Sequence, residues 1–415
     1  PRGRPCRQQI YNEAANGAAV DLGLRLARAA TGRMDVVSLE GAYHGWTTAT
    51  DALCTNPVDR PGWREELPPS VHVVEQPDPY RGRFGDDGPA YAAAVTDALA
   101  DAEATSGLRA DLVFFPYLDS YLRFLPFSPI PKLLLNRPWS GLYLRNHHHG
   151  EARSPKKSLR LLAKGDALLR SQLCRGIGVL DERFIPAMEK LYRVPVIPFP
   201  DVTQADLPAA PYSLAVEILR KAAGRSIVGM IGLERRKGFL TLIRTARLAR
   251  EAGLSYYFVC AGTIHLSEFS EEEQREAATL AHGIAAGEIT NIHFDPQAGR
   301  IPAEADYNEV FRTFDIAWAA YEDFQGSSGT LSKAAAFEIP CLATGGECIG
   351  HRVVKYRLGL TIAEGSAADA LAVLPRLISR TDREGNPLSP DFAGYRADHS
   401  LQRLDRILAG LLSLG

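Results

Sequence analysis

Short apolar runs alternate along the chain with amphipathic stretches of helical period. Apolar runs without polar alternation are typical of strands buried on both faces, and helices between them are typical of a parallel sheet covered on both sides. The first series of predicted strands comprises Asp35–Leu39, Val71–Val74, Leu112–Tyr117, Leu133–Leu135, Ile177–Leu180 and Val194–Pro198. The second series comprises Ile227–Ile231, Tyr256–Ala261, Asn291–Phe294, Ile316–Ala320, Cys341–Ala343 and Leu360–Ile362. The pattern predicts an α/β protein with two doubly wound, Rossmann-like domains.

A proline-rich stretch separates the two series. Pro198, Pro200 and Pro208 lie in a polar setting, and prolines break helices and stiffen connectors. We therefore expect an N-terminal domain over residues 1–200, a C-terminal domain over 201–390, and a C-terminal helical segment over 391–415. The helix expected at Leu401–Leu412 could pack on either domain. Two such domains facing each other would leave a ligand-binding cleft at the carboxyl ends of their strands.

The composition is that of an ordinary globular protein and argues against some partners. The chain has 415 residues, of which 46% are hydrophobic and 23% charged, so it is long enough for two cores. Its 47 basic and 49 acidic residues leave a net charge of −2, which predicts no nucleic-acid partner. No signal peptide is evident and no apolar run is long enough to cross a membrane, so we expect a cytoplasmic protein, with peripheral membrane contact left open.

The cysteines do not form a recognisable site. All six are scattered, without C-x-x-C pairs or histidine spacing suited to zinc. We interpret them as buried or idle thiols in a reducing compartment. The sequence therefore predicts no metal centre.

A first cluster of candidate binding residues follows the strand expected at Ile227–Ile231. A glycine turn, three consecutive cations and a second glycine lead from this strand into an amphipathic helix. Cations and free backbone N–H groups at such a place can stabilise the charge that develops on a diphosphate leaving group. A solvated basic turn is the alternative. The candidates are Gly232, Arg235, Arg236 and Lys237.

A second cluster follows the strand expected at Ile316–Ala320. An acidic and aromatic loop runs into a serine- and glycine-rich segment that opens an alanine-rich helix. Hydroxyl side chains cap helix starts, and the uncovered N–H groups of a helix start attract anions. Simple capping is the alternative, but it leaves the two glycines unexplained. The candidates are Glu322, Asp323, Gln325, Ser327, Ser328, Gly329 and Thr330.

Together these clusters resemble the donor domain of GT-B glycosyltransferases. Lys237-Gly238 is similar to the K-G pair that precedes the first long helix in that family, and residues 333–340 have the spacing of its E-x7-E segment with the following proline. The resemblance covers roughly residues 111 to 390. It implies a nucleotide-diphosphate sugar as the donor, transfer of a hexosyl-type group with retention of configuration, and no other cofactor. The acceptor (a glycan, a lipid or a small molecule) is open. The chain has no D-x-D sequence, so metal-carboxylate catalysis has no support.

Two positions depart from the family pattern. The register places Gln325 and Lys333 where the family has glutamates, so the sugar-binding role would pass to Glu322 or Asp323. We predict that the ammonium of Lys333 points into the cleft beside the diphosphate, and that Lys333→Glu weakens nucleotide binding. The competing interpretation is a solvated lysine on the helix surface.

A histidine-rich loop lies in the first domain. His147 and His149 flank a third histidine, and in the transferase interpretation one of them would contact the reacting sugar or accept the proton of the acceptor. A partly exposed polar loop is the alternative. Farther on, the carboxylates of Asp181 and Glu182 follow a predicted strand and either line the cleft or, as we favour, cap the next helix.

Residues 9 to about 110 resemble a different family, the class III pyridoxal-phosphate aminotransferases. The sequence GAYHG at positions 41–45 places Tyr43 where that family stacks an aromatic ring on the cofactor, and His44 beside it. No lysine or acidic segment has the context needed for an aldimine and for the ring nitrogen, so pyridoxal phosphate is not expected. Two accounts stay open: a fusion with an aminotransferase fragment, or a segment that supplies the first strand and loop of the acceptor-side domain.

A basic, leucine-bearing helix is expected at residues 154–175. Such a surface can sit on anionic lipid, but a packed helix with a solvated basic side is the simpler interpretation. The sequence leaves three functions open: a glycosyltransferase, an inactive relative of the aminotransferases, and a GT-B protein that binds nucleotides without turnover.

Overall fold

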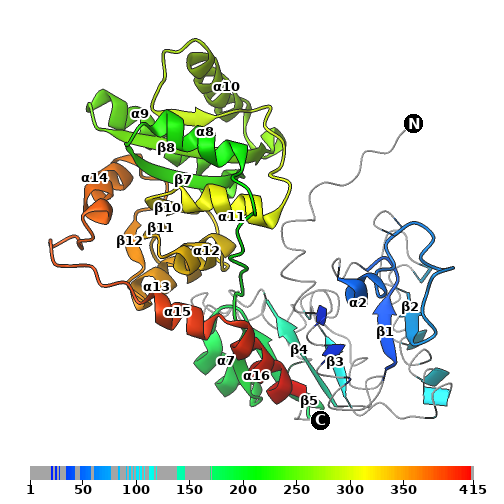
Figure 1. The fold of residues 1–415 in the computed structure, drawn as a ribbon. Helices are drawn as coiled ribbons and strands as arrows, with labels where there is room; N and C mark the ends of the chain where they lie inside the picture. The colour runs from blue at the N-terminus through cyan, green and yellow to red at the C-terminus, as the bar shows by residue number, and fades with distance from the viewer. Residues whose placement is uncertain are drawn as a thin grey trace. The chain divides into compact units, whose positions relative to one another are not determined.

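The protein is described by a computed structural model (Figure 1). The structure describes residues 34–42, 47–57, 60–75, 112–115, 138–144 and 171–412, together with isolated positions before residue 170. The chain divides into two compact units. Unit 1 comprises residues 1–200 and 401–415, and unit 2 comprises residues 201–400. The chain therefore leaves unit 1 once and returns to it at its end.

Parallel strands form the framework of unit 1. Six of them fall within its described residues: β1 (Val36–Leu39), β2 (Val71–Val74), β3 (Val113–Phe115), β4 (Trp139–Tyr143), β5 (Cys174–Val179) and β6 (Val196–Pro198). In this part of the chain β1 pairs with β2, and β3 to β6 form a second sheet in sequential order. A short helix, α2 (Thr48–Asp51), follows β1, and its N-cap Thr47 forms a capping box with Thr50.

Strand β4 was not among the predicted strands, whereas the stretch predicted at residues 133–135 lies outside the described residues. The reason is local composition. Ser140 and Gly141 interrupt the apolar pattern of β4, yet each fits the buried surroundings of this strand. The hydroxyl of Ser140 donates to the carbonyl of Leu411 at 3.3 Å, and a Cβ on Gly141 would lie 2.8 Å from the carbonyl oxygen of Phe115.

Two of the described helices cover the faces of the sheet that β3 to β6 form. α7 (Ile185–Tyr192) packs Met188 and Tyr192 on the face that carries Trp139 and Ile177. α16 (Leu401–Leu412) packs on the opposite face, where Ile407 and Leu411 join Leu142. The buried positions of α16 recur with helical spacing, namely Leu404, Ile407, Leu408 and Leu411. The last helix of the chain is therefore part of unit 1.

Unit 2 contains one parallel sheet of six strands in the order β12-β11-β10-β7-β8-β9. The strands are β7 (Ser226–Leu233), β8 (Tyr256–Ile264), β9 (Ile292–Phe294), β10 (Ile316–Ala319), β11 (Cys341–Thr344) and β12 (Gly359–Ile362). Their central residues are buried, as expected for strands with helices on both faces.

Helices line both faces of this sheet. One face carries α8 (Ser213–Ala222), α11 (Glu304–Arg312), α12 (Gly329–Phe337), α13 (Cys348–Lys355) and α15 (Phe392–Asp398). The other carries α9 (Phe239–Glu251), α10 (Glu271–Ala285) and α14 (Ala367–Ile378). The segment predicted as one C-terminal element is thus divided, since α15 packs Phe392 and Tyr395 into the core of unit 2. Within the described residues, none of the helices combines the length and the apolar composition that a membrane span requires.

The chain enters unit 2 at Asp201 and leaves it at Ser400. The residues at these two ends of unit 2 lie close together. The backbone N–H of Asp201 donates to Nδ1 of His399 at 2.9 Å, and the carbonyl of Asp201 accepts from the hydroxyl of Ser332 at 2.8 Å. Tyr395 stacks on His399 with ring centroids 4.1 Å apart. These contacts fix the first and last residues of unit 2 to α12 and α15.

The packing of α16 leads to a test of unit 1. Leu411→Ala removes a fully buried side chain from the face formed with Leu142 and Ile407, so we expect the free energy of unfolding to fall by about 2–5 kcal/mol. Leu401→Ala, in the same helix but 52% exposed, is the matched control and should change it by about 0.5 kcal/mol or less. Urea unfolding measures both. Equal, small effects of the two substitutions would contradict the packing of α16 described above.

Candidate functional site

The centre of the unit 2 sheet is a topological switch point. β7 and β10 are neighbours, but the chain continues from β7 towards β8 on one side and from β10 towards β11 on the other. The loops that leave such a pair of strands diverge, and ligands of open α/β sheets bind in the crevice this creates at the carboxyl edge. Here the two loops are residues 234–238 and 320–328, which contain most of the predicted binding residues. Of the others, Gly232 lies near the end of β7, and Gly329 and Thr330 are the first residues of α12.

The two loops are held together by their backbones. Gly238 has a left-handed conformation (φ 75°), and a Cβ at this position would overlap the carbonyl oxygen of Ala320. Beside this approach the N–H of Glu322 donates to the carbonyl of Arg236 at 2.8 Å. Only glycine combines this φ with so close a contact. The glycine of the predicted K-G pair therefore joins the two loops.

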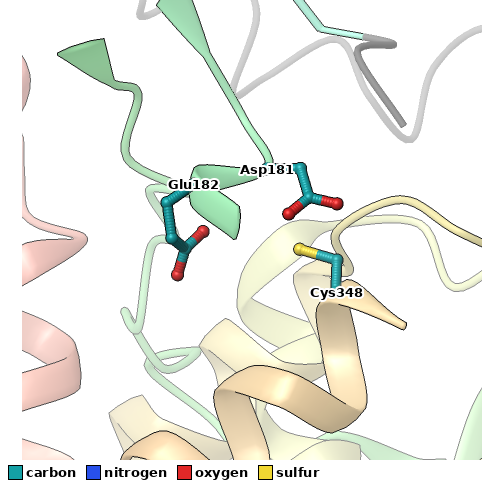
Figure 2. A group of neighbouring side chains, drawn as sticks. All are labelled: Asp181, Glu182 and Cys348. Carbon is teal, nitrogen blue, oxygen red and sulfur yellow. The ribbon is translucent and has the colours of Figure 1, made fainter. Parts of the chain in front are cut away.

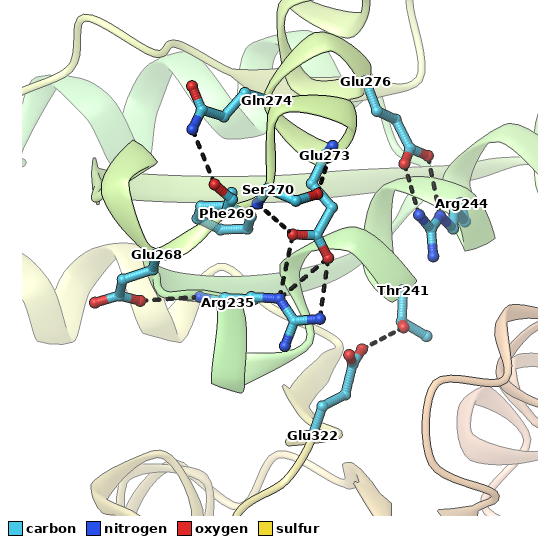
Figure 3. Close-up of polar contacts among 10 residues, drawn as sticks. All are labelled: Arg235, Thr241, Arg244, Glu268, Phe269, Ser270, Glu273, Gln274, Glu276 and Glu322. Carbon is cyan, nitrogen blue, oxygen red and sulfur yellow. Dashed lines mark hydrogen bonds and ion pairs between the residues drawn. The ribbon is translucent and has the colours of Figure 1, made fainter.

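The carboxylate of Glu322 lies at the beginning of α9. It accepts a hydrogen bond from the hydroxyl of Thr241, in the first turn of that helix (Figure 3). A helix start stabilises negative charge. The carboxylate predicted to be catalytic is therefore hydrogen-bonded within unit 2 in this structure.

Each of the three predicted cations has an acidic partner. Arg235 pairs with Glu273 of α10 at 3.0 Å (Figure 3). The pKa of Arg235 is raised, mainly by this hydrogen bond and in smaller part by the charges of Glu322 and Asp323. Its backbone N–H donates to Glu268 at 3.3 Å. Arg235 is therefore directed towards α10 rather than towards the second loop.

Arg236 and Lys237 share the carboxylate of Glu234. Nε of Arg236 donates to Oε2 of Glu234 at 2.6 Å, and Nζ of Lys237 lies 3.2 Å from Oε1. The guanidinium of Arg236 also stacks over Phe324 of the other loop, 4.9 Å from the ring centroid. Lys237 donates to the carbonyl of Ile231 at 3.3 Å. These two cations face the switch point.

Gly232 makes room for one of these cations. It has φ 82°, and a Cβ there would lie 2.5 Å from Nζ of Lys237. A side chain at this position would displace the ammonium. Gly232 therefore contributes to the predicted site by leaving room for the ammonium of Lys237.

The start of α12 combines internal capping with an open backbone. Oγ of Ser328 accepts from the N–H of Thr330 at 3.1 Å and donates to the hydroxyl of Tyr321 at 2.8 Å, which lies 3.1 Å from Oγ1 of Thr330. The hydroxyls of Ser328 and Thr330 are thus used within the loop. Gly329 is exposed, and within the described part of the chain no heavy atom outside this helix turn lies within 4 Å of the place where its Cβ would be. An anion can approach the first turn of α12 there.

The remaining residues of the second loop are more exposed. Asp323 is exposed and has φ 48°, a strained conformation for a residue other than glycine. Its N–H donates to Glu364, beyond β12, at 3.2 Å. Gln325 is exposed and Ser327 is half-buried. Loop residues held in strained conformations by hydrogen bonds are typical of binding sites.

Lys333 is paired inside unit 2. It is 5% exposed, and its ammonium donates to Oδ1 of Asn308 at 2.6 Å, to Glu304 and to the carbonyl of Gln204. Burial lowers the pKa of Lys333, and the hydrogen bond with Glu304 acts in the opposite direction. An ammonium has three donors, and all three are used here. Lys333 is therefore not a solvated lysine on the helix surface. Its ammonium also has no donor left for the diphosphate that the sequence led us to expect there.

Several predicted residues lie outside the described part of the chain. They are His147, His149, Tyr43 and His44, and residues 154–168 and 170 of the helix expected at 154–175. At the end of that stretch Cys174 and Arg175 belong to strand β5, so the predicted helix does not extend to residue 175. Of the acidic pair after β5 (Figure 2), Asp181 accepts from the N–H of Arg183 at 3.2 Å and pairs with its guanidinium at 2.7 Å. It caps the 3-10 turn η4 (Glu182–Phe184), which is the capping role favoured from the sequence.

Some residues of the site had no signal in the sequence. Thr241 lies in the first turn of a helix and Glu364 belongs to no motif, yet they bind Glu322 and Asp323. Phe324 belongs to the acidic and aromatic loop, but its contact with Arg236 was not predicted. Glu234 lies beside the predicted cations, and charge pairing with them was the one available indication. Cys348, in the first turn of α13 (Figure 2), is buried, which is one of the two states that the sequence predicted for the cysteines.

Comparison with known proteins identifies the fold. No protein-family model matches the chain. The structure of Anabaena HepE in complex with UDP is similar over 98% of both chains, with a TM-score of 0.63 at 14% identity. A glycosyltransferase from Rickettsia africae gives 0.56 at 11% identity over 96% of both chains. Sucrose-phosphate synthase from Thermosynechococcus elongatus gives 0.51 at 14% identity, covering 83% of this chain and 88% of that one. The chain has the GT-B glycosyltransferase fold, as predicted.

A short stretch is similar in sequence to aminotransferases, which confirms the second resemblance. It is 44% identical over 68 residues to alanine–glyoxylate aminotransferase 2-like of Drosophila melanogaster. It is 37% identical over 82 residues to the mitochondrial alanine–glyoxylate aminotransferase 2 homolog 2 of Arabidopsis thaliana. The chain spans only 14% and 16% of the lengths of these two relatives.

The pairing of Lys333 can be tested by charge reversal. Lys333→Glu places a second carboxylate beside Glu304 and leaves the oxygens of Gln204 and Asn308 without their donor. We expect the free energy of unfolding to fall by about 3–5 kcal/mol. Lys221→Glu, which reverses an exposed lysine paired with Glu217 on α8, should change it by about 0.5 kcal/mol or less. Urea unfolding measures both variants. Unchanged stability of Lys333→Glu combined with weaker binding of UDP would instead support a lysine that faces the ligand.

Proposed function

We propose that the protein is a glycosyltransferase that moves a hexosyl group from a nucleotide-diphosphate sugar to an acceptor, without a metal and with retention of configuration. One observation carries the proposal: the open start of α12 lies at the switch point of a GT-B fold, where the loop of Arg236 and Lys237 is joined to the loop that leads into α12. The solved structures of HepE contain UDP, and in one case UDP and glucose. We infer a uridine nucleotide as the first donor to test.

The diphosphate would bind between the two loops. The backbone N–H of Gly329 and the dipole of α12 supply positive potential from one side. Arg236 and Lys237 supply cations from the other side. The leaving diphosphate gains negative charge as the glycosidic bond breaks, so these groups stabilise the transition state more than the ground state. This arrangement supplies in protein groups the charge compensation that a metal ion provides in other transferases.

Hydroxyl groups of the donor would be bound by the exposed part of the second loop. Asp323 and Gln325 are exposed there, and Ser327 adds a hydroxyl. Glu322 acts in this proposal as an anchor, because its carboxylate is bound to Thr241. His147 and His149 stay candidates for contact with the reacting sugar or the acceptor. Unit 1 would provide the acceptor side.

Nucleotide binding tests the first step. We expect UDP to bind, and Arg236→Ala and Lys237→Ala each to weaken binding about tenfold or more, because each removes a charge-assisted contact to phosphate. Lys221→Ala, which removes an exposed lysine on α8, is the control and should bind as the unchanged protein does. Isothermal titration at low salt measures all four proteins, with GDP and ADP as competing nucleotides. Absence of binding by all three nucleotides would rule out the proposed donor site.

A second candidate function is a nucleotide-binding protein without turnover. It is favoured by the commitment of Lys333 and Glu322 to internal contacts, since these are residues at or near the positions of the family glutamates. Both functions predict binding of the nucleotide. They differ in what happens to the sugar.

Donor hydrolysis separates the two functions. A competent transferase transfers some sugar to water in the absence of acceptor, so UDP should accumulate slowly from UDP-glucose. We expect this release to fall at least tenfold in Arg236→Ala, because the guanidinium stabilises the leaving group, and to be unchanged in Lys221→Ala. A coupled assay for UDP measures the rate. Tight binding of UDP-glucose and other UDP-hexoses with no release of UDP would favour the protein without turnover.

A further inference from the structure

Glu234 makes two ion pairs in the loop between β7 and α9. Its Oε2 accepts from Nε of Arg236 at 2.6 Å, and its Oε1 lies 3.2 Å from Nζ of Lys237. One carboxylate therefore bridges both cations that face the switch point. No phosphate is needed to hold them in place.

The carboxylate of Glu234 does not cap the helical turn that follows it. Glu234 is the N-cap residue of the 3-10 turn η5 (Arg235–Lys237), where an acidic side chain normally accepts from the backbone, but it makes no such capping hydrogen bond. Asp181 illustrates the contrast, because at the same position of η4 it does cap the turn. Among the described residues, the polar contacts of the Glu234 side chain are those with Arg236 and Lys237.

The carboxylate of Glu234 is ionised at neutral pH. Burial raises the pKa of Glu234, but the charges of Lys237 and Arg236 outweigh this effect and the pKa is lowered overall. The side chain of Glu234 retains 24% exposure, so the carboxylate has a route to solvent when another anion takes its place. Its ion pairs are of the partly exposed kind that contribute little to the stability of the fold.

The pair between Arg235 and Glu273 is different. Glu273 also closes a capping box with Ser270 at the start of α10 (Figure 3), accepting from the N–H of Ser270 at 2.7 Å. Glu273 is thus part of the fold, whereas Glu234 can leave its partners without breaking a helix cap. Only the second arrangement suits an exchangeable anion.

We propose that Glu234 is a resident counter-anion of the diphosphate site: it holds Arg236 and Lys237 while the site is empty and is displaced when the diphosphate binds. The proposal rests on the proposed function for the location of the diphosphate. It means that affinity for the nucleotide is set by an exchange of anions. A ligand with two phosphates can replace the carboxylate on both cations, whereas one phosphate competes less well.

Neutralising the carboxylate tests the exchange. Glu234→Gln keeps the size of the side chain and removes its charge, so UDP and inorganic pyrophosphate should bind about three- to tenfold more tightly at low salt. Glu234→Asp has a shorter side chain that cannot bridge both cations. Its affinity for UDP should therefore lie between those of the unchanged protein and Glu234→Gln. Glu217→Gln, which removes the partner of exposed Lys221 on α8, should leave the affinity unchanged. Isothermal titration measures each Kd. The Glu234→Gln substitution should increase the affinity for UMP less than the affinity for UDP.

The outcomes separate this inference from the proposed function. Weaker or unchanged binding of both probes by Glu234→Gln would overturn the inference, because Glu234 would then orient the cations for the ligand rather than compete with it. Tighter binding of pyrophosphate with no binding of any nucleoside diphosphate would keep the anion exchange and reject the nucleotide donor. If neither probe binds any of the four proteins, both proposals are wrong.

Discussion

The close approach of Gly238 to the carbonyl of Ala320 is the constraint on which the candidate site depends. Parallel strands bring their carboxyl ends to one edge, but the chain leaves β7 and β10 in opposite directions, so the two loops would separate without a further contact. The left-handed glycine lets the backbone of the first loop lie against the second. The hydrogen bond from Glu322 to Arg236 then extends the contact by two more residues on each side. A larger residue at position 238 would lose this contact and with it the spacing of the site.

Charge balance is the second feature that organises the site. Three consecutive cations in a tight turn repel one another, and the repulsion grows where solvent is excluded. The fold answers with one carboxylate from α10 for Arg235 and one from the turn itself for Arg236 and Lys237. The start of α9 is likewise matched by Glu322, whereas the start of α12 leaves Gly329 open. Of these two helix starts at the switch point, α12 is the one that retains room for an anion from outside.

Elements that depend on local interactions were predictable from the sequence, whereas elements that depend on distant partners were not. Strands with continuous apolar runs, such as β7 and β8, and the helix at residues 401–412 were predictable because the pattern is local. Strand β4 was not, since Ser140 and Gly141 are explained only by partners at Leu411 and Phe115. Lys333 was assigned to a ligand for the same reason. Its acceptors lie on α11 and at residue 204, and no local pattern reveals them.

The resemblance to aminotransferases and the similarity to GT-B structures carry different information. A match of 68 residues at 44% identity shows a shared stretch of sequence, but it covers only 14% of the relative. Catalysis with pyridoxal phosphate needs a lysine and an acid that come from distant parts of a chain, and so short a match does not supply them. The structural similarity covers 98% of the chain at 14% identity. Within unit 1, β1 and β2 form a parallel pair, an arrangement common to many α/β proteins. A local sequence match can therefore coexist with a different overall fold, and the function must be argued from the site that the whole fold builds.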